Sequence, residues 1–230
     1  MNIRTVTGAP VLLLLASACS TVNYQSPQFA ERASHHQIIA VLPFEMVLTG
    51  KPPAGLTAEQ IARIEEGESV AFQEAYYHRL LQQASVHRRH PIRVEIQPVE
   101  TTNRLLAQAG IGVRESWGMS AKSLASVLRV DAVVSTSVRT TRYLSNGESF
   151  GVDLGLQAVN EATEGRFAPL LPWGLVKTQD ISANCELIDS LDGAVLWQID
   201  FAQAADWQNP ADEVIAGFTG ELAKKFPYRG

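Results

Sequence analysis

The sequence predicts a mixed α/β fold: a three-layer-like arrangement in which a sheet of about five strands carries packed helices, with a last helix at the C-terminus. Three observations support this fold class. Residues Ile38–Phe44 form an unbroken apolar run, which is typical of a strand buried on both faces. Strand-like and helix-like segments then alternate up to a second such run, Val130–Val138. Two further strand-like segments, 182–188 and 194–201, are joined by a turn with an Asp-Gly pair, which favours a hairpin.

The first strand and the first helix are bounded by turn and cap residues. Pro43 lacks an amide hydrogen, so it marks the end of the strand or a bulge. Thr57 and Gln60 have the spacing of a capping box, which predicts a helix from about residue 57. Gly67 is a candidate break within this helix. The later half of this helix has one face that is expected to lie toward the sheet. That face comprises Phe72, Ala75, Tyr76, Arg79 and Leu80.

Shorter elements fill the middle of the chain. Residues Ile92–Ile96 alternate between apolar and polar, which predicts a half-exposed strand. Residues Thr101–Ala109 predict a short helix that Gly110 ends. Ser120 is a candidate N-cap for a helix over Ala121–Leu128, which leads directly into the second apolar strand.

The C-terminal part combines the hairpin with a strongly marked helix. In the second strand of the hairpin, one side is apolar. The other side, with Gln198 and Asp200, is polar and expected to be more exposed to solvent. The apolar side is expected to contain Val195, Trp197, Ile199 and Phe201. Asn209 and Pro210 then provide a cap and a first-turn proline for the last helix. The apolar face of that helix comprises Val214, Ile215, Phe218 and Leu222.

The N-terminus has the parts of a bacterial lipoprotein signal. Arg4 supplies a positive start, a short apolar stretch follows, and small residues precede Cys19. The apolar stretch is shorter than the roughly 20 residues needed to cross a bilayer. Two alternatives are open for Cys19, a free thiol after ordinary cleavage or lipid attachment, and the pattern favours lipid attachment. Because Ser20 is not Asp, signals of this family imply export to the outer membrane.

These features divide the chain into three parts: residues 1–18 as the signal peptide, 19–36 as a flexible tether, and 37–230 as one α/β domain. Residues 20–36 are polar and contain few apolar side chains, as expected of a linker. The net charge of −5 over 230 residues disfavours nucleic acid as a partner, because nucleic-acid binding needs clustered positive charge. With Cys19 lipidated, Cys185 is the one remaining cysteine, so no intramolecular disulfide is expected.

Three blocks together resemble a known family. They are Ile38–Phe44, the segment 130–135 after a helix, and the segment 189–197 before the last helix. The chain is similar in these blocks to uncharacterised lipoproteins with the periplasmic α/β domain of the curli secretion lipoprotein CsgG, the amino-terminal domain of TolB and the peptidoglycan-synthase activator LpoB. The resemblance implies an envelope adaptor or assembly component and supplies no catalytic residues.

Two surface segments are candidate partner sites. Arg79, Arg88, Arg89 and Arg93 form the only local concentration of cations and could bind an anionic group or an acidic partner, although such residues are commonly just solvated. In the segment 146–174, alternate positions are apolar, namely Phe150, Val152, Leu154 and Leu156. The alternatives for this segment are a plain edge strand with a covering loop, a partner-binding edge, and a membrane-inserting hairpin.

The sequence contains no recognisable catalytic, metal or cofactor signature. There is no Gly-x-Ser-x-Gly elbow and no glycine-rich phosphate loop, and Cys185 is expected to be a buried, inert thiol. His35 and His36 lie in the predicted tether. We therefore predict a non-enzymatic lipoprotein, anchored to the outer membrane and facing the periplasm, that binds envelope proteins or itself. The alternatives are a ring-forming secretion-channel subunit and a hydrolase of envelope polymers.

Overall fold

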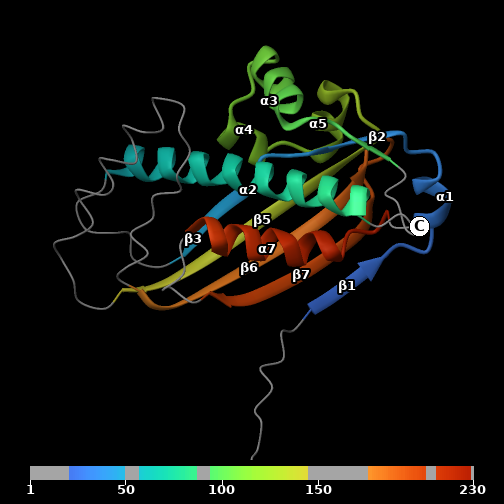
Figure 1. Ribbon diagram of the computed structural model, residues 1–230. Helices are drawn as coiled ribbons and strands as arrows, with labels where there is room; N and C mark the ends of the chain where they lie inside the picture. The colour runs from blue at the N-terminus through green and yellow to red at the C-terminus, as the bar shows by residue number, and fades with distance from the viewer. Residues whose placement is uncertain (1–20, 50–56, 87–93, 145–175, 206–210, 229–230) are drawn as a thin grey trace, which may run out of the picture.

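The computed structural model describes residues 21–49, 57–86, 94–144, 176–205 and 211–228. Within these residues the fold is a seven-stranded mixed sheet with helices packed on it, so the predicted fold class is confirmed (Figure 1). The strands are β1 (Thr21–Gln25), β2 (Ile38–Val41), β3 (Glu45–Thr49), β4 (Glu95–Ile96), β5 (Ala132–Leu144), β6 (Val176–Asp189) and β7 (Val195–Ala205). The helices are α1 (Phe29–Ala33), α2 (Ala58–Val86), α3 (Val99–Gln108), α4 (Val113–Trp117), α5 (Ala121–Leu128) and α7 (Ala211–Lys224).

The strand order is β1-β7-β6-β5-β2-β4, and β3 also pairs with β5. Strands β1, β7, β6 and β5 are antiparallel neighbours, whereas β2 and β3 both run parallel to β5. Val41 pairs with Val134, and Glu45 pairs with Ser137. Between these two pairs, β2 and β3 are joined by three residues (42–44), whereas β5 has only two (135–136). Pro43 lies at this irregularity, which confirms the predicted strand end or bulge.

Helix α2 begins at the predicted capping box. The Thr57 Oγ1 atom accepts a hydrogen bond from the Gln60 amide at 3.2 Å, and the Gln60 Oε1 atom accepts one from the Thr57 amide at 2.8 Å. The predicted break at Gly67 is wrong, because α2 continues through it. A glycine inside a helix costs only about 1 kcal/mol, and burial of Phe72 and Tyr76 on the same helix exceeds that cost.

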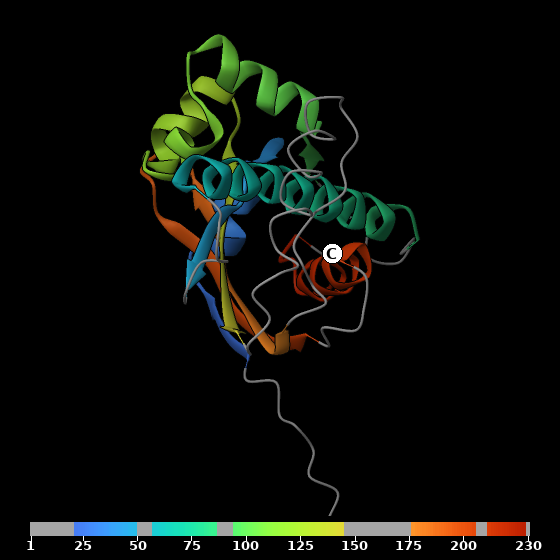
Figure 2. The same cartoon turned by 90° about the vertical axis from the view of Figure 1, so that its left-hand side faces the viewer.

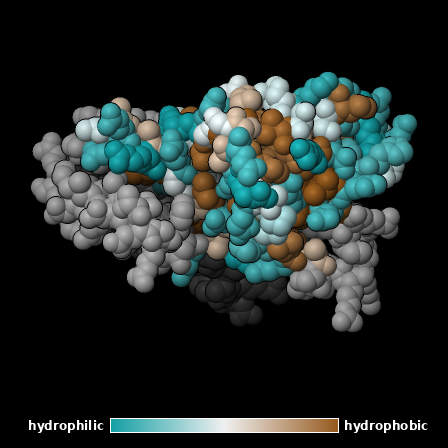
Figure 3. All heavy atoms as spheres, turned by 90° about the horizontal axis from the view of Figure 1, so that it is seen from above, coloured by the Kyte–Doolittle hydropathy of each residue, from teal (hydrophilic) through white to brown (hydrophobic). Residues whose placement is uncertain are grey.

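Helices lie on both sides of the sheet, but they cover the two sides unequally. Helices α2 and α7 lie along one side (Figure 2) and bury against it the larger core, which includes Phe72, Tyr76, Phe218, Leu222, Val138, Cys185 and Ile199. On the other side, α3 and α5 bury a smaller core, which includes Leu106, Leu124, Leu128, Val133 and Ile188. Figure 3 looks down on α3, α4 and α5 and shows hydrophobic side chains in the middle of this surface with hydrophilic ones around them.

The β6–β7 hairpin forms where predicted, and Gly193 adopts the positive φ of 79° that its turn requires. Trp197, Ile199 and Phe201 face the larger core. Val195 does not share that face, because the register shifts next to Ile188 and Val195 packs against the smaller core. A bulge of this kind reverses the side toward which a residue points, so the prediction for Val195 is wrong.

The prediction of a flexible tether over residues 19–36 is wrong for the described part of that segment. Residues Thr21–Gln25 form β1, which pairs with β7, and α1 follows. The guanidinium of Arg32 binds Asp189 at 3.2 Å and Asp192 at 2.7 Å, which fixes this segment to the β6–β7 turn. This ion pair holds the pKa of the Asp192 carboxyl well below its usual range.

His36 connects the N-terminal segment to the end of the chain. Its Nδ1 atom is hydrogen-bonded to the Tyr228 hydroxyl, and its Nε2 atom lies 3.7 Å from an Asp189 oxygen. The His36 and Asp189 side chains are only 5% and 6% exposed. Burial lowers the pKa of His36 and raises the pKa of Tyr228. The ring of Phe29 in α1 also packs on Tyr228, with 5.7 Å between ring centroids.

Candidate functional site

The side of the sheet opposite α2 and α7 carries polar side chains beyond the region that α3 and α5 cover. Strands alternate their side chains between two faces, so every second residue of β1, β3, β5, β6 and β7 points to this side. No helix of the described segments lies over it (Figure 2). We call this surface the open sheet face, and it comprises Tyr24, Glu45, Val47, Ser135, Ser137, Arg139, Ser182, Asn184, Glu186, Gln198, Asp200 and Ala202.

The strand register arranges these residues in three rows across the sheet. The first row contains Tyr24, Gln198, Glu186 and Ser135. The second contains Asp200, Asn184, Ser137 and Glu45. The third contains Ala202, Ser182, Arg139 and Val47. Neighbouring strands lie about 4.8 Å apart, so each row presents polar groups at a regular spacing on a fixed backbone.

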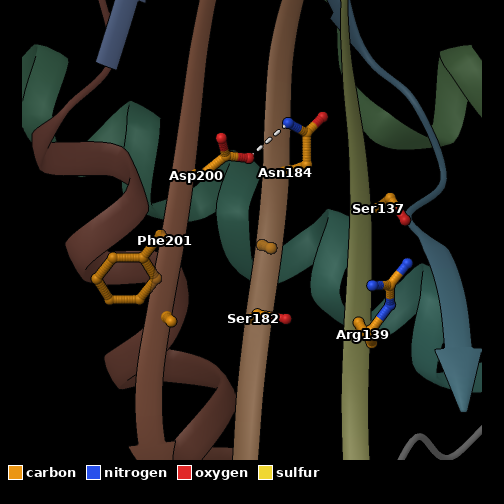
Figure 4. Close-up of a pocket in the computed structure, with 8 residues that line it drawn as sticks. Ser137, Arg139, Ser182, Asn184, Asp200 and Phe201 are labelled. Atoms are coloured by element: carbon orange, nitrogen blue, oxygen red, sulfur yellow. Dashed lines mark hydrogen bonds between the residues drawn. The ribbon is translucent and has the colours of Figure 1, made fainter. Parts of the chain in front are cut away.

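A shallow hollow of about 250 Å³ lies over the second and third rows. Figure 4 shows Ser137 and Arg139 on β5, Ser182 and Asn184 on β6, and Asp200 on β7 around it. Helices α2 and α7 lie behind the strands in this view, with the ring of Phe201 turned toward α7. The floor of the hollow is therefore rigid, because the larger core supports the strands from behind.

The charges of the open sheet face are of both signs. The Asn184 side chain donates a hydrogen bond to the Asp200 carboxylate at 2.7 Å, which orients both groups. Burial is the main reason that the pKa of the Glu186 carboxyl is raised, and the negative charge of Asp200 raises it further. Arg139 brings a permanent positive charge to the third row. The open sheet face thus presents two neighbouring carboxylates on one part and a guanidinium on another.

A second, smaller hollow of about 40 Å³ adjoins the open sheet face and shares Glu45 and Ser135 with it. Its rim includes Trp117 and Met119, near the start of α5. The guanidinium of Arg114 lies 5.1 Å from the centre of the Trp117 ring, and the Trp117 Nε1 atom has no hydrogen-bond partner among the described residues. The polar rows therefore end at an aromatic rim, in which the Trp117 Nε1 atom is buried.

The serines of the open sheet face lie beside charged side chains of both signs. Ser182 lies opposite Arg139, which stays protonated and cannot accept a proton. Ser137 lies opposite Glu45, and Ser135 lies opposite Glu186. Cys185 points to the opposite side of the sheet, where burial raises its pKa to about 12, so the predicted buried thiol is confirmed.

In the described segments, no three His, Cys, Asp or Glu side chains come together as a metal site requires. Nor do the same segments contain a helix that is long and apolar enough to span a bilayer.

Most residues predicted as sites from the sequence fall outside the described segments. These are Cys19, Arg88, Arg89, Arg93, Phe150, Val152, Leu154 and Leu156. Arg79 is described: it lies on α2, near Gly220 of α7, and donates a hydrogen bond to Gln82 at 3.0 Å. It is thus on the other side of the sheet from the open sheet face.

Most of the open sheet face was not predicted from the sequence. The polar side of β7, with Gln198 and Asp200, was predicted, but its connection with β5 and β6 was not. A signal was present, because Ser135, Ser137 and Arg139 alternate with apolar or buried residues along β5. Only the register shows that these positions and those of β7 form one surface.

No protein-family model matches the chain, and no curated protein matches it. Solved structures similar to it include the lipoprotein GNA1162 from Neisseria meningitidis, with 12% identity over 82% of this chain and 96% of that one and a TM-score of 0.46. A PelC dodecamer from Paraburkholderia phytofirmans has 13% identity over 89% and 94%, with a TM-score of 0.43. The LpoB C-terminal domain from Salmonella enterica has 10% identity over 78% and 93%, with a TM-score of 0.32. At such identities and TM-scores the similarity assigns neither a family nor a function, and the resemblance to CsgG and TolB stays a prediction.

Proposed function

We propose that this chain is a lipoprotein, anchored through Cys19 to the outer membrane and facing the periplasm, that serves as a non-catalytic binding subunit of an envelope assembly. The open sheet face is its binding surface, and the partner is another envelope protein. The lipoprotein signal at the N-terminus supports the location.

The observation that carries this proposal is the arrangement of the three rows. Arg139, Asp200 and Glu186 hold charges of both signs at fixed positions on three adjacent strands. The Asn184–Asp200 hydrogen bond orients two of the groups before a partner arrives, which lowers the entropy lost on binding. Mixed charges on a rigid surface favour selective association, because a wrong partner would place like charges together.

Site-specific photo-crosslinking in intact cells tests this function. A crosslinking amino acid is introduced at Ser137 on the open sheet face and, as the control, at Leu81, an exposed residue of α2 on the other side of the sheet. We expect one dominant foreign envelope protein at position 137 and none at position 81. The variant Arg139→Glu should weaken that crosslink because it reverses the charge of the third row.

Other outcomes distinguish the alternatives. Crosslinks to the chain itself alone, in assemblies of high order, would favour a ring-forming subunit. Equal capture at positions 137 and 81 would show that the open sheet face is not the binding surface. Cleavage of an envelope polymer by the purified protein, lost on substitution of Ser137 or Ser182, would overturn the non-catalytic assignment.

The anchor is tested separately by Cys19→Ala. The processed variant should leave the membrane fraction and keep its fold, because Cys19 precedes the first described strand. Fractionation of envelopes and circular dichroism measure the two effects. A processed variant that stays with the membranes would refute lipid attachment.

A further inference from the structure

Strand β1 forms one border of the sheet. It pairs with β7 on one side, and no strand of the described segments lies on its other side (Figure 1). Asn23, Tyr24 and Gln25 of β1 are all exposed. The Tyr24 side chain is 47% exposed, so much of an aromatic ring lies in solvent at this border.

The register shows which backbone groups of β1 are directed outward. The Ser26 amide donates a hydrogen bond to the Leu196 carbonyl at 2.9 Å. In an antiparallel pair, hydrogen-bonded and non-hydrogen-bonded positions alternate, so Tyr24 also directs its amide and carbonyl toward β7. Asn23 and Gln25 therefore direct theirs away from β7, where a further strand can bind them.

Strand β1 lacks the features that commonly protect an edge strand. Such strands are kept from pairing by charged side chains, proline, a bulge or very short length. At the other end of the strand order, β4 has only two residues, and one of them is the exposed Glu95. Strand β1, with the sequence TVNYQ, has neither charge nor proline, and its register with β7 is regular over all five residues.

We infer that β1 pairs in antiparallel orientation with β1 of a second copy of this chain, about a two-fold axis that passes beside Tyr24. Asn23 of each copy then lies opposite Gln25 of the other, and every outward amide meets an outward carbonyl. Tyr24 lies opposite Tyr24 at a non-hydrogen-bonded position, where Cα atoms are about 4.5 Å apart. Both rings lie on the side of the open sheet face.

The symmetry of this edge favours a second copy as the occupant. Asn23 and Gln25 are each one residue from Tyr24, so a two-fold axis there makes the edge complementary to itself. A two-fold axis also brings identical segments together, which is unfavourable when they carry charge, and β1 carries none. The pair of Tyr24 rings covers apolar surface that is exposed in the single chain, and aromatic cross-strand pairs stabilise a sheet.

The pairing joins the open sheet faces of two copies into one continuous surface, with the two Tyr24 rings at its centre. A partner that contacts both copies gains affinity from two linked sites. The inference depends neither on the lipid attachment nor on the function proposed above, and the crosslinking at Ser137 tests that function separately.

Cysteine trapping tests the pairing. In a processed Cys19→Ala background, Cys185 is buried with a raised pKa and stays unreactive. Tyr24→Cys and, as the matched control, Asn23→Cys are oxidised with diamide. We expect several-fold more disulfide-linked dimer for Tyr24→Cys, because the two Cα atoms at position 24 are within disulfide range, whereas those at position 23 lie beyond the limit of about 7 Å. A mixture of Asn23→Cys and Gln25→Cys chains should form dimers with one of each.

A second variant tests the backbone pairing with the Tyr24 ring in place. Asn23→Pro removes an outward amide and leaves the hydrogen bonds between β1 and β7 intact. Analytical ultracentrifugation should show a dimer for the unaltered chain and several-fold weaker association for Asn23→Pro, with circular dichroism confirming an unchanged fold. Equal trapping at positions 23 and 24, or equal association of the two chains, would overturn the inference. So would trapping of a foreign protein, in place of a second copy, at position 24 in intact cells.

Discussion

The two faces of the sheet carry different kinds of side chain on the same strands. Under α2 and α7, Cys185, Ile199 and Val138 are completely buried. On the open sheet face the residues next to them along the strands, such as Glu186 and Gln198, are polar and partly exposed. Because side chains alternate, the larger core and the open sheet face draw on separate positions of the same strands. The side chains of the open sheet face can therefore change with little effect on the larger core.

The largest expected contrast is in thiol reactivity on β6. Native Cys185 faces the core with a pKa of about 12, whereas Ser182→Cys would place a thiol on the open sheet face. At pH 8 in a Cys19→Ala background, the thiol at position 182 should react with a maleimide or disulfide reagent about a thousandfold faster, since only thiolates react. Stopped-flow or mass-spectrometric labelling measures both rates. Similar rates would contradict the assignment of the two faces.

A pair of neighbouring residues on β7 tests the same contrast in stability. Ile199→Ala removes a side chain that is 0% exposed and should lower the free energy of unfolding by about 2–5 kcal/mol. Gln198→Ala, one residue away on the open sheet face, should change it by less than about 0.5 kcal/mol. Urea unfolding followed by tryptophan fluorescence measures the difference. A larger loss for Gln198→Ala would reverse the two faces.

The pH dependence of stability tests the burial of His36, which contacts Tyr228 and lies close to Asp189. Burial lowers the pKa of His36 below 6.5, with opposing effects from Asp189 and Asp131. Below pH 6.5 His36 is protonated in the unfolded chain but still neutral in the folded one. The free energy of unfolding therefore falls as the pH decreases from 6.5 toward the lower pKa that His36 has in the folded protein. The slope for this one proton is at most about 1.4 kcal/mol per pH unit. Denaturant unfolding at several pH values should show a flatter profile for His36→Gln, and an unchanged profile would refute the assignment.

The smallest effects concern the caps of the helices on the two sides. The Thr57 Oγ1 atom caps α2, and the Ser120 Oγ atom caps α5 by accepting from the Ser123 amide at 3.2 Å. Thr57→Ala and Ser120→Ala should each cost about 1 kcal/mol in chemical unfolding. If only Thr57→Ala destabilises the protein, α5 contributes less to the free energy of unfolding than its packing in the smaller core indicates.

Local patterns in the sequence predicted much of the fold because they report local physics. The capping residues Thr57, Gln60 and Ser120 all make the expected hydrogen bonds. The Asp-Gly turn and the apolar strands also form where expected. Each of these features depends on a few neighbouring residues.

Features that depend on distant partners were not predicted. Residues Thr21–Gln25 are mainly polar, and only pairing with β7 makes them a strand. His36 is buried by Tyr228, which lies 192 residues later in the chain. The open sheet face also requires register, because Arg139, Asn184 and Asp200 come from three strands. The predicted sites followed local concentrations of one residue type instead, and Arg79 lies on the other side of the sheet.

The contact of His36 and Phe29 with Tyr228 sets an order of events for the chain. The segment that holds β1 and α1 cannot complete its packing until Tyr228, 192 residues after His36, is available. During synthesis, the first described segment must therefore wait for the last one. Because Tyr228 follows nearly all of the described residues, the N-terminal segment completes its packing late in folding, after the long strands and α7 have been made.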